Sequence, residues 1–319
     1  MEIFFVTLKQ MAILLTFIAI GYVMNKAKLV NANVGAVFAT AVTFFFMPMT
    51  CFNTMIKNTN LENIIVKWPV LLVSVIFLIS SFFLAKFISN FFTKDKMEHA
   101  VYTYSFVITN LGYMGYPIVE AVFGEIGLYY FMLFCLPLNI FLNTIGMNML
   151  TQRTKINFKM LLNPIIIALV LGVVLGLLGV KLPDFIFDIT NTGAACTTPC
   201  AMILLGFVLA KTPFIKIVLN PKMYIAAVIR LIALPLIFGG ITFALCYFLK
   251  LDMLYVFLVV AVSCLPMGSN TIVFPESIGK DGTLGAQSCF VSTIMALITL
   301  PVMFMLLTEI LKGYNLFGI

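Results

Sequence analysis

The sequence predicts an all-α membrane protein with ten transmembrane helices, built as two inverted five-helix repeats in which helices 4 and 9 are broken and cross. Three observations lead to this fold class. Of the 319 residues, 62% are hydrophobic and only 10% are charged, whereas soluble domains are about 25% charged. Ten stretches are apolar and long enough to span a bilayer. Two of them carry clustered glycine, proline and asparagine at matching places in the two halves.

A transmembrane helix needs about 20 mostly apolar residues. The first such stretch has Glu2 where a signal peptide would be basic, so we expect it to be retained as a helix. The seventh and ninth stretches are less apolar than the others, and we expect them to be buried among them. The ten stretches lie at about 3–24, 34–56, 68–92, 98–123, 126–150, 161–180, 185–210, 222–249, 253–279 and 284–311.

The loops differ in their content of lysine and arginine, which accumulate on the cytoplasmic side of a membrane protein. The richer loops hold Lys26, Lys28, Lys94, Lys96, Arg153, Lys155, Lys159, Lys211, Lys216, Lys222 and Lys280. The alternate loops hold Lys57, Lys67, Lys181 and Lys250. The richer set is expected to face the cytoplasm, which places both termini outside the plasma membrane. The net charge of +7 therefore reflects topology and indicates no nucleic-acid partner.

The chain divides into two halves of five helices each. Residues 1–150 hold helices 1–5, residues 151–160 form a polar cytoplasmic linker, and residues 161–319 hold helices 6–10. Because each half has an odd number of helices, the second half enters the membrane from the opposite side. This arithmetic is that of the inverted repeats found in secondary transporters.

The fourth stretch is interrupted at TNLGYMGYP, residues 109–117. Gly112, Gly115 and Pro117 all weaken a helix, proline by about 3 kcal/mol and each glycine by about 1 kcal/mol. Unwound backbone at membrane depth must be buried in protein or line a water-filled cavity. Asn110 would add an amide to such a cavity.

The ninth stretch has a counterpart at PMGSNTIVFP, residues 266–275, with Ser269, Asn270 and Pro275. Proline suits the first turn of a new half-helix, so Pro117 and Pro275 are expected there. The start of a helix offers free N–H groups and a partial positive charge. Each interruption alone could be an ordinary kink, since glycine and proline are frequent in membrane helices. Two at matching places favour a binding site for a small carboxylate.

Charges inside predicted membrane helices are candidates for function. Arg230 could pair with a substrate carboxylate or with an acid, or could extend to the cytoplasmic surface. Asp188 lies near the outer end of the seventh helix, where a solvated helix end would also explain it. Glu120 and Glu276 follow the two prolines and could couple transport to protons, or could satisfy helix starts.

Asparagines also mark the fifth stretch. Asn139 and Asn143 are four residues apart and so share one face of a helix. They could line the polar path, or they could form interhelical hydrogen bonds.

The motif Asn-x3-Met-Gly-x-Pro, formed by Asn110, Met114, Gly115 and Pro117, resembles the fourth-helix motif of the auxin efflux carrier family. This family includes the plant PIN carriers and bacterial permeases for malate or malonate. A looser similarity to the family's ninth and tenth helices comes from Pro275, Glu276, Asp281, Gly285, Ala286, Ser292, Thr293, Leu300 and Pro301.

The resemblance implies a fold akin to those of sodium–proton antiporters and bile-acid transporters. Helices 1, 2, 6 and 7 would form a scaffold, and helices 3–5 and 8–10 a transport domain. It further implies a homodimer that moves a mono- or dicarboxylate across the membrane by an elevator-type movement. Asn110 and Pro117 match the family motif position by position, and Asn270 and Pro275 match less closely. The long cytoplasmic loop of the plant carriers between helices 5 and 6 is absent.

Other functions have weaker support. A sodium-coupled carrier of the bile-acid type would need buried acids, which are scarce, and a sensor on a transporter fold would bind without flux. The single histidine, His99, and the lack of a metal or nucleophile motif disfavour an enzyme. We therefore expect no metal and no cofactor.

Overall fold

The computed structural model describes residues 2–31, 33–61, 64, 67–152, 162–211, 220–276 and 278–314. Helices make up the regular structure of this part, with no strand beyond one isolated bridge. Seven helical stretches are long and apolar enough to cross a membrane: Leu8–Lys26, Val34–Asn58, Pro69–Ser89, Leu111–Thr151, Asp184–Ala210, Pro221–Leu249 and Thr283–Leu311. Two shorter apolar helices, Pro164–Leu177 and Leu254–Ser263, accompany them. The protein is therefore an all-helical membrane protein.

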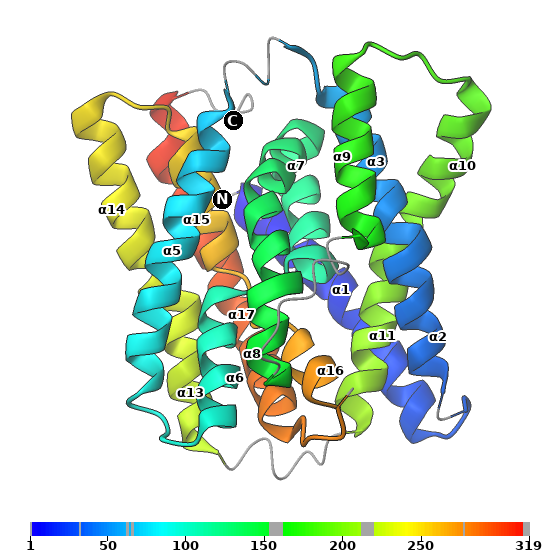
Figure 1. Ribbon diagram of the computed structural model, residues 1–319, viewed down its shortest axis with the longest axis vertical. Helices are drawn as coiled ribbons and strands as arrows, with labels where there is room; N and C mark the ends of the chain where they lie inside the picture. Colours follow the sequence, from blue (N-terminus) through cyan, green and yellow to red (C-terminus); the bar gives the residue numbers. More distant parts are fainter. Residues whose placement is uncertain are drawn as a thin grey trace.

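The helices follow one another in the order shown in Figure 1. The α-helices are α1 (Glu2–Lys26), α2 (Val34–Ala41), α3 (Met47–Asn58), α5 (Pro69–Ser89), α6 (Lys96–Val107), α7 (Tyr116–Phe141), α8 (Met147–Thr151), α9 (Pro164–Leu177), α10 (Asp184–Ala195), α11 (Thr197–Lys211), α13 (Pro221–Val228), α14 (Leu234–Leu249), α15 (Leu254–Ser263), α16 (Asn270–Glu276) and α17 (Thr283–Leu311). Four π-helical turns join some of them end to end: η1 (Val42–Phe46), η2 (Leu111–Gly115), η3 (Leu142–Gly146) and η5 (Ile229–Ala233). A 3-10 turn, η6 (Lys312–Tyr314), follows α17.

Gly124 divides α7 into two helical segments. Its backbone has φ 71° and ψ −174°, a conformation that glycine adopts without steric cost. The segment before it belongs to the predicted fourth helix, and the segment after it to the predicted fifth. The 41-residue stretch Leu111–Thr151 therefore combines parts of two predicted helices, which is one reason why fewer long helices are found than the ten predicted.

The helices fall into two groups in Figure 1. On the right, α3 packs along α9 and α10, and α11 packs along α1 and α2. On the left, α5 packs on α6, and α14 packs on α15. Between the groups lie α7, α8 and α16.

The contact between α1 and α11 depends on two glycines. A Cβ atom on Gly206 would lie 2.2 Å from the Ile18 carbonyl oxygen, and one on Gly21 would lie 2.1 Å from that of Ile203. Such small residues let helix backbones approach closely, which drives packing where lipid removes the hydrophobic force between helices.

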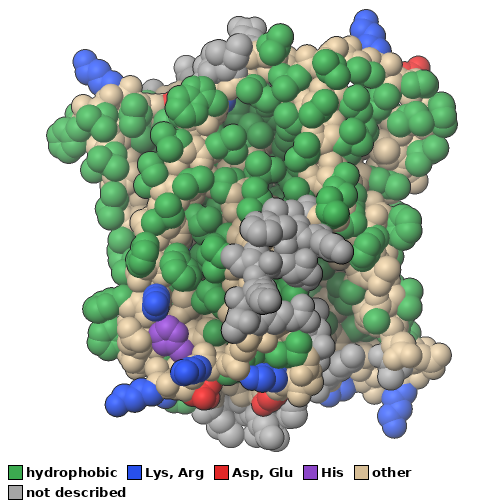
Figure 2. All heavy atoms as spheres, in the orientation of Figure 1, with side chains coloured by type: hydrophobic (Ala, Val, Ile, Leu, Met, Phe, Trp, Pro, Cys, Tyr) green, Lys and Arg blue, Asp and Glu red, His purple; other side chains and the backbone are tan. Residues whose placement is uncertain are grey.

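The outer surface suits a bilayer. Figure 2 shows a broad hydrophobic band on the visible face, with most charged side chains toward the two ends. Phenylalanines such as Phe44, Phe83 and Phe87 are more than half exposed, which is favourable only against lipid.

Candidate substrate-binding site

Two interrupted helices cross at the centre of the protein. The first break separates α6 from η2 at Ile108–Asn110, and the second separates α15 from α16 at Cys264–Ser269. Thr109 and Met267 form an antiparallel bridge between the two breaks, and the Asn110 N–H donates to the Pro266 carbonyl oxygen at 2.9 Å. Both interruptions predicted from the sequence are thus present, and their unwound segments contact each other directly.

The crossing needs a residue without a side chain. A Cβ atom on Gly268 would lie 3.2 Å from the Thr109 carbonyl oxygen, closer than most such contacts allow. Gly268 therefore permits the close approach of the two backbones.

The prolines lie differently from the prediction. The second half-helix begins at Asn270, so Pro275 is the sixth residue of α16 and not part of its first turn. Pro117 is the second residue of α7, but helical turns already start at Leu111 in η2. The helices thus restart at residues before the prolines, at Leu111 and at Asn270.

A cavity of about 650 Å³ adjoins the crossing. One side of it is formed by α2, η1 and α11, which belong to the right-hand group of helices. The other side is formed by the two breaks, η2, η3 and α16. Three π-helical turns, η1, η2 and η3, contribute to it, in keeping with the frequent use of such turns at functional sites. The polar lining residues are Thr40, Thr43, Thr109, Asn110, Tyr113, Tyr116, Asn139, Asn143, Asn163, Ser269 and Asn270.

The cavity wall carries neutral polar groups. None of the lining residues in the described part of the chain is Lys, Arg, His, Asp or Glu. Asn110 is only 4% exposed, and its Nδ2 has no hydrogen-bond partner. The buried Thr109 Oγ1 is also without a partner. A buried polar atom left unsatisfied costs about 1–3 kcal/mol, so a group that reached these two atoms would gain hydrogen bonds.

The remaining asparagines form a chain along the cavity. Asn163 Nδ2 donates to Asn143 Oδ1 at 3.2 Å, and Asn143 Nδ2 donates to the Asn139 carbonyl oxygen at 2.8 Å. Asn139 Nδ2 lies 3.4 Å from the Tyr116 hydroxyl. The structure thus shows both uses considered for Asn139 and Asn143, because they line the cavity and also take part in hydrogen bonds.

Asn270 and Ser269 stand on the opposite half-helix. Asn270 Nδ2 donates to the Tyr104 hydroxyl at 3.1 Å, which fixes its amide on the wall. Both residues line the cavity, together with Gly112 and Asn110 of the first half-helix.

Asn163 is a lining residue that the sequence analysis missed. Its side chain caps α9 by accepting from the Ile165 N–H at 2.9 Å. The Asn-Pro pair at 163–164 is a recognisable helix start, but nothing in the sequence shows that this start reaches the cavity.

Several predicted site residues lie behind the cavity wall. Pro117 and Pro275 are buried and do not line it. Gly115 packs against the second break, since a Cβ atom there would lie 2.7 Å from Leu265 Cδ1. The side chain of Glu276 lies outside the described residues.

Arg230 does not reach the cavity or the surface. It lies in η5 and is only 1% exposed. Nη1 donates to the Phe106 carbonyl oxygen at 2.7 Å, and Nη2 donates to that of Val262 at 3.2 Å. The guanidinium therefore binds protein backbone, and neither of the roles considered as substrate partner or surface residue describes its position.

The predicted acids lie away from the cavity. Asp188 is exposed on α10, and Glu120 is exposed on α7. Glu120 interacts electrostatically with Glu125 and Lys57, which belong to a separate polar network at the far end of α3.

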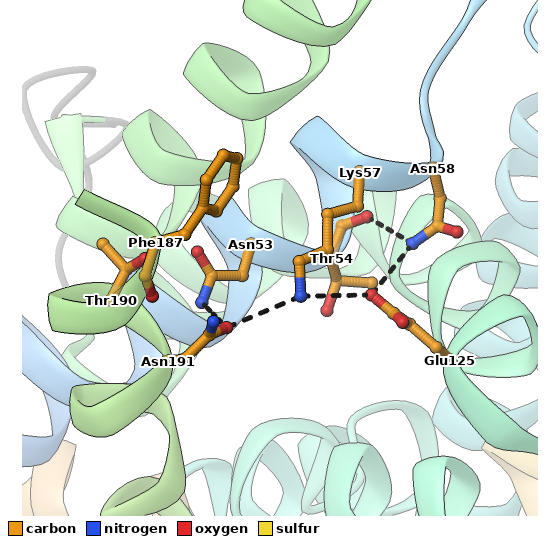
Figure 3. A network of polar contacts seen from close by, with 8 residues as sticks. All are labelled: Asn53, Thr54, Lys57, Asn58, Glu125, Phe187, Thr190 and Asn191. Atoms are coloured by element: carbon orange, nitrogen blue, oxygen red, sulfur yellow. Dashed lines mark hydrogen bonds and ion pairs between the residues drawn. The ribbon is translucent and has the colours of Figure 1, made fainter. Parts of the chain in front are cut away.

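That network joins α3 and α10 to α7 (Figure 3). Lys57 Nζ lies 3.8 Å from Glu125 Oε1 and 3.5 Å from Asn191 Oδ1. Asn53 Nδ2 also donates to Asn191 Oδ1, at 2.9 Å. The cavity lies along α2 and η1, whereas this network lies at the end of α3, so the two occupy opposite parts of one transmembrane stretch.

Crossing interrupted helices beside a polar cavity in a membrane protein are the features of a membrane transporter. A family model described as "Membrane transport protein" matches residues 6–157 and 153–304. The chain belongs to this family, the auxin efflux carrier family, and is a membrane transporter. It is similar to an uncharacterized transporter of Methanocaldococcus jannaschii, with 28% identity over 313 residues that cover 90% of this chain and 94% of the relative.

Proposed function

We propose that this protein is a secondary transporter of a small organic anion, a mono- or dicarboxylate such as malate or malonate. The observation that carries the proposal is the unpartnered Asn110 amide on the wall of the cavity. A carboxylate oxygen is the natural acceptor for this N–H donor, and hydrogen bonds to charged groups are about twice as strong as neutral ones.

The wall can hold an anion without a buried cation. In the first turn of η2, Leu111 N–H already donates to the Thr109 carbonyl oxygen at 2.8 Å, so the N–H groups of Gly112 and Tyr113 are the ones that an anion would meet. Such a helix start carries roughly half a positive charge. Asn110 and Asn270 add side-chain groups at the same place. The cavity volume falls within the range of about 300–1,000 Å³ that is typical of small-molecule sites.

The proposed architecture has ten spans in two inverted repeats. In it, α1–α3 and α9–α11 form the scaffold, and the remaining helices form the transport domain that carries the crossing. The cavity between the two groups supports this division. We propose an elevator-type movement, in which the transport domain slides along the scaffold.

The network in Figure 3 would have to break during such a movement. Glu125 belongs to the proposed transport domain, and Lys57 and Asn191 belong to the scaffold. A short bifunctional maleimide that joins Lys57→Cys to Glu125→Cys should therefore abolish most of the flux, in a background where Cys196 and Cys200 are replaced by Ser. The same reagent on Lys57→Cys alone is the matched control. Unchanged flux in the cross-linked fraction would contradict the elevator movement.

The same proposal has three further parts. Transport is coupled to protons through Glu120 or Glu276. The protein is a homodimer in the plasma membrane, with both termini outside. Sodium coupling of the bile-acid type and a sensor without flux are the alternatives. Flux under an imposed pH gradient or sodium gradient separates these possibilities. Dependence on pH alone supports proton coupling, whereas dependence on sodium alone supports the alternative.

The substrate class is tested by ligand-induced thermal stabilisation of the purified protein. Malate and malonate should raise the unfolding temperature in proportion to their concentration. Malonamide has nearly the same shape without charge and should not. Equal stabilisation by malonamide and malonate would refute an anion site, and stabilisation without any flux would support the sensor.

A further inference from the structure

The two half-helices that end at the crossing leave several backbone carbonyls without their usual donors, among them those of Phe106 and Val262. In a continuous helix, the Phe106 carbonyl would accept from the Asn110 N–H and the Val262 carbonyl from the N–H of residue 266. The Asn110 N–H is directed instead to the Pro266 carbonyl. Residue 266 is proline and has no N–H. The crossing itself therefore creates both vacancies.

Arg230 donates a hydrogen bond to each of these two carbonyls. Its Nη1 donates to Phe106 and its Nη2 to Val262, at 2.7 Å and 3.2 Å. Phe106 lies in the last turn of α6 and Val262 in the last turn of α15. One planar guanidinium thus binds the ends of two helices that lie more than 150 positions apart in the chain.

The helix ends also offset part of the buried charge, although the Arg230 Nε is left without a hydrogen-bond partner. A helix C-terminus carries roughly half a negative charge, so two of them together partly offset one buried cation. Within the described part of the chain, no acidic side chain forms an ion pair with Arg230. Backbone dipoles are the groups that offset its charge.

We propose that Arg230 is the positioning residue of the crossing: it ties α6 to α15, so that η2 and α16 present their starts to the cavity as one rigid unit. The effect of Arg230 on transport rests on the proposed function, but its role in holding α6 and α15 together does not. A substrate held by Asn110 would then depend on a residue that it never touches.

The test compares Arg230→Met with Lys222→Met. Lys222 lies near the start of α13, on the same predicted helix as Arg230, and its Nζ also donates to a backbone carbonyl, that of Phe92 at 2.9 Å. Lys222→Met therefore controls for the loss of a cation that binds a backbone carbonyl away from the crossing.

Hydrogen exchange measured by mass spectrometry gives a readout that needs no substrate. Arg230→Met should speed exchange in both segments around 106–111 and 262–268, by about tenfold or more, and Lys222→Met should not. Maleimide labelling of Cys264, which is fully buried in the second break, should rise in the same variant, whereas Cys135 stays protected. Unchanged exchange, or a change in only one segment, would overturn the assignment.

Two further variants keep the proposal falsifiable if Arg230→Met does not fold. Arg230→Lys keeps the charge but lacks the planar fork, so its exchange should be intermediate. Arg230→Gln/Pro266→Ala restores an N–H for Val262 and should exchange more slowly around 262–268 than Arg230→Gln. If the restored N–H slows nothing, the account of the vacancies is wrong.

The proposed function can fail without this inference failing. Arg230→Met should raise the KM for malate by about tenfold, whereas Asn110→Ala should weaken binding and leave exchange around 262–268 unchanged. Absence of any anion binding, together with the predicted exchange, would refute the function and support the role of Arg230.

Discussion

The two sides of the crossing differ in how their backbone is satisfied. On the side where helices end, Arg230 binds the Phe106 and Val262 carbonyls and is itself fully buried. On the side where helices begin, the buried side-chain amide nitrogen of Asn110 is left without a partner, and Asn110 lines a cavity. The buried positive charge of Arg230 thus stabilises the crossing, while the side chains that line the cavity are neutral. Under the proposed function, such a site would bind an anion through N–H groups and would also release it, because no permanent opposite charge holds the anion in place.

The largest effect on the open side is expected from Asn110→Asp. This change keeps the shape but replaces the amide donor with a carboxylate, which repels an anion at close range in a poorly screened site. Malate affinity measured by isothermal titration should fall roughly a hundredfold or more, and the unfolding temperature without ligand should also fall, because a carboxylate at this buried position has no partner. Nearly unchanged affinity at neutral pH would place the anion elsewhere.

Among substitutions outside the cavity wall, Gly285→Ala should cause the largest loss of stability. A Cβ atom at this position would lie 2.2 Å from the Thr271 carbonyl oxygen in α16. Overpacking of this kind costs about 1–3 kcal/mol, so the unfolding temperature should fall. Gly240→Ala is the matched control, because nothing lies within 4 Å of a Cβ atom there. Equal unfolding temperatures for the two variants would contradict the packing described for α16 on α17.

A smaller effect is expected from Ser292→Ala. The Ser292 hydroxyl accepts from the Met267 N–H at 3.1 Å inside the second break. Its loss leaves a buried donor unsatisfied, at a cost of about 1–3 kcal/mol, with malate affinity changed little. Ser80→Ala removes an exposed serine hydroxyl that bonds only its own helix and should be neutral. A large loss of affinity with no loss of stability would mean that Ser292 belongs to the open side.

The interruptions could be predicted because their causes are local. Glycine, proline and asparagine at 109–117 and 266–275 break a helix whatever surrounds them. The position of the second helix start was less predictable, since it depends on Asn270 and not on Pro275.

The contacts of Arg230 and Asn163 could not be predicted from the sequence. Arg230 finds its partners in two segments far away along the chain, and only the crossing brings these together. Asn163 reaches the cavity because α9 starts there, which depends on how α9 packs on α3. Local chemistry thus predicted where the backbone opens, whereas tertiary contacts decide which side chains meet it.

The most direct test of the central claim is the flux of radiolabelled malate into proteoliposomes that contain the wild type, Asn110→Ala or Asn148→Ala. Asn148 is an asparagine of α8 that does not line the cavity, so it controls for loss of an amide. The account predicts saturable flux for the wild type and Asn148→Ala, and at least a tenfold loss, roughly, for Asn110→Ala. Saturable flux that is equal in all three proteins would contradict anion binding at the crossing.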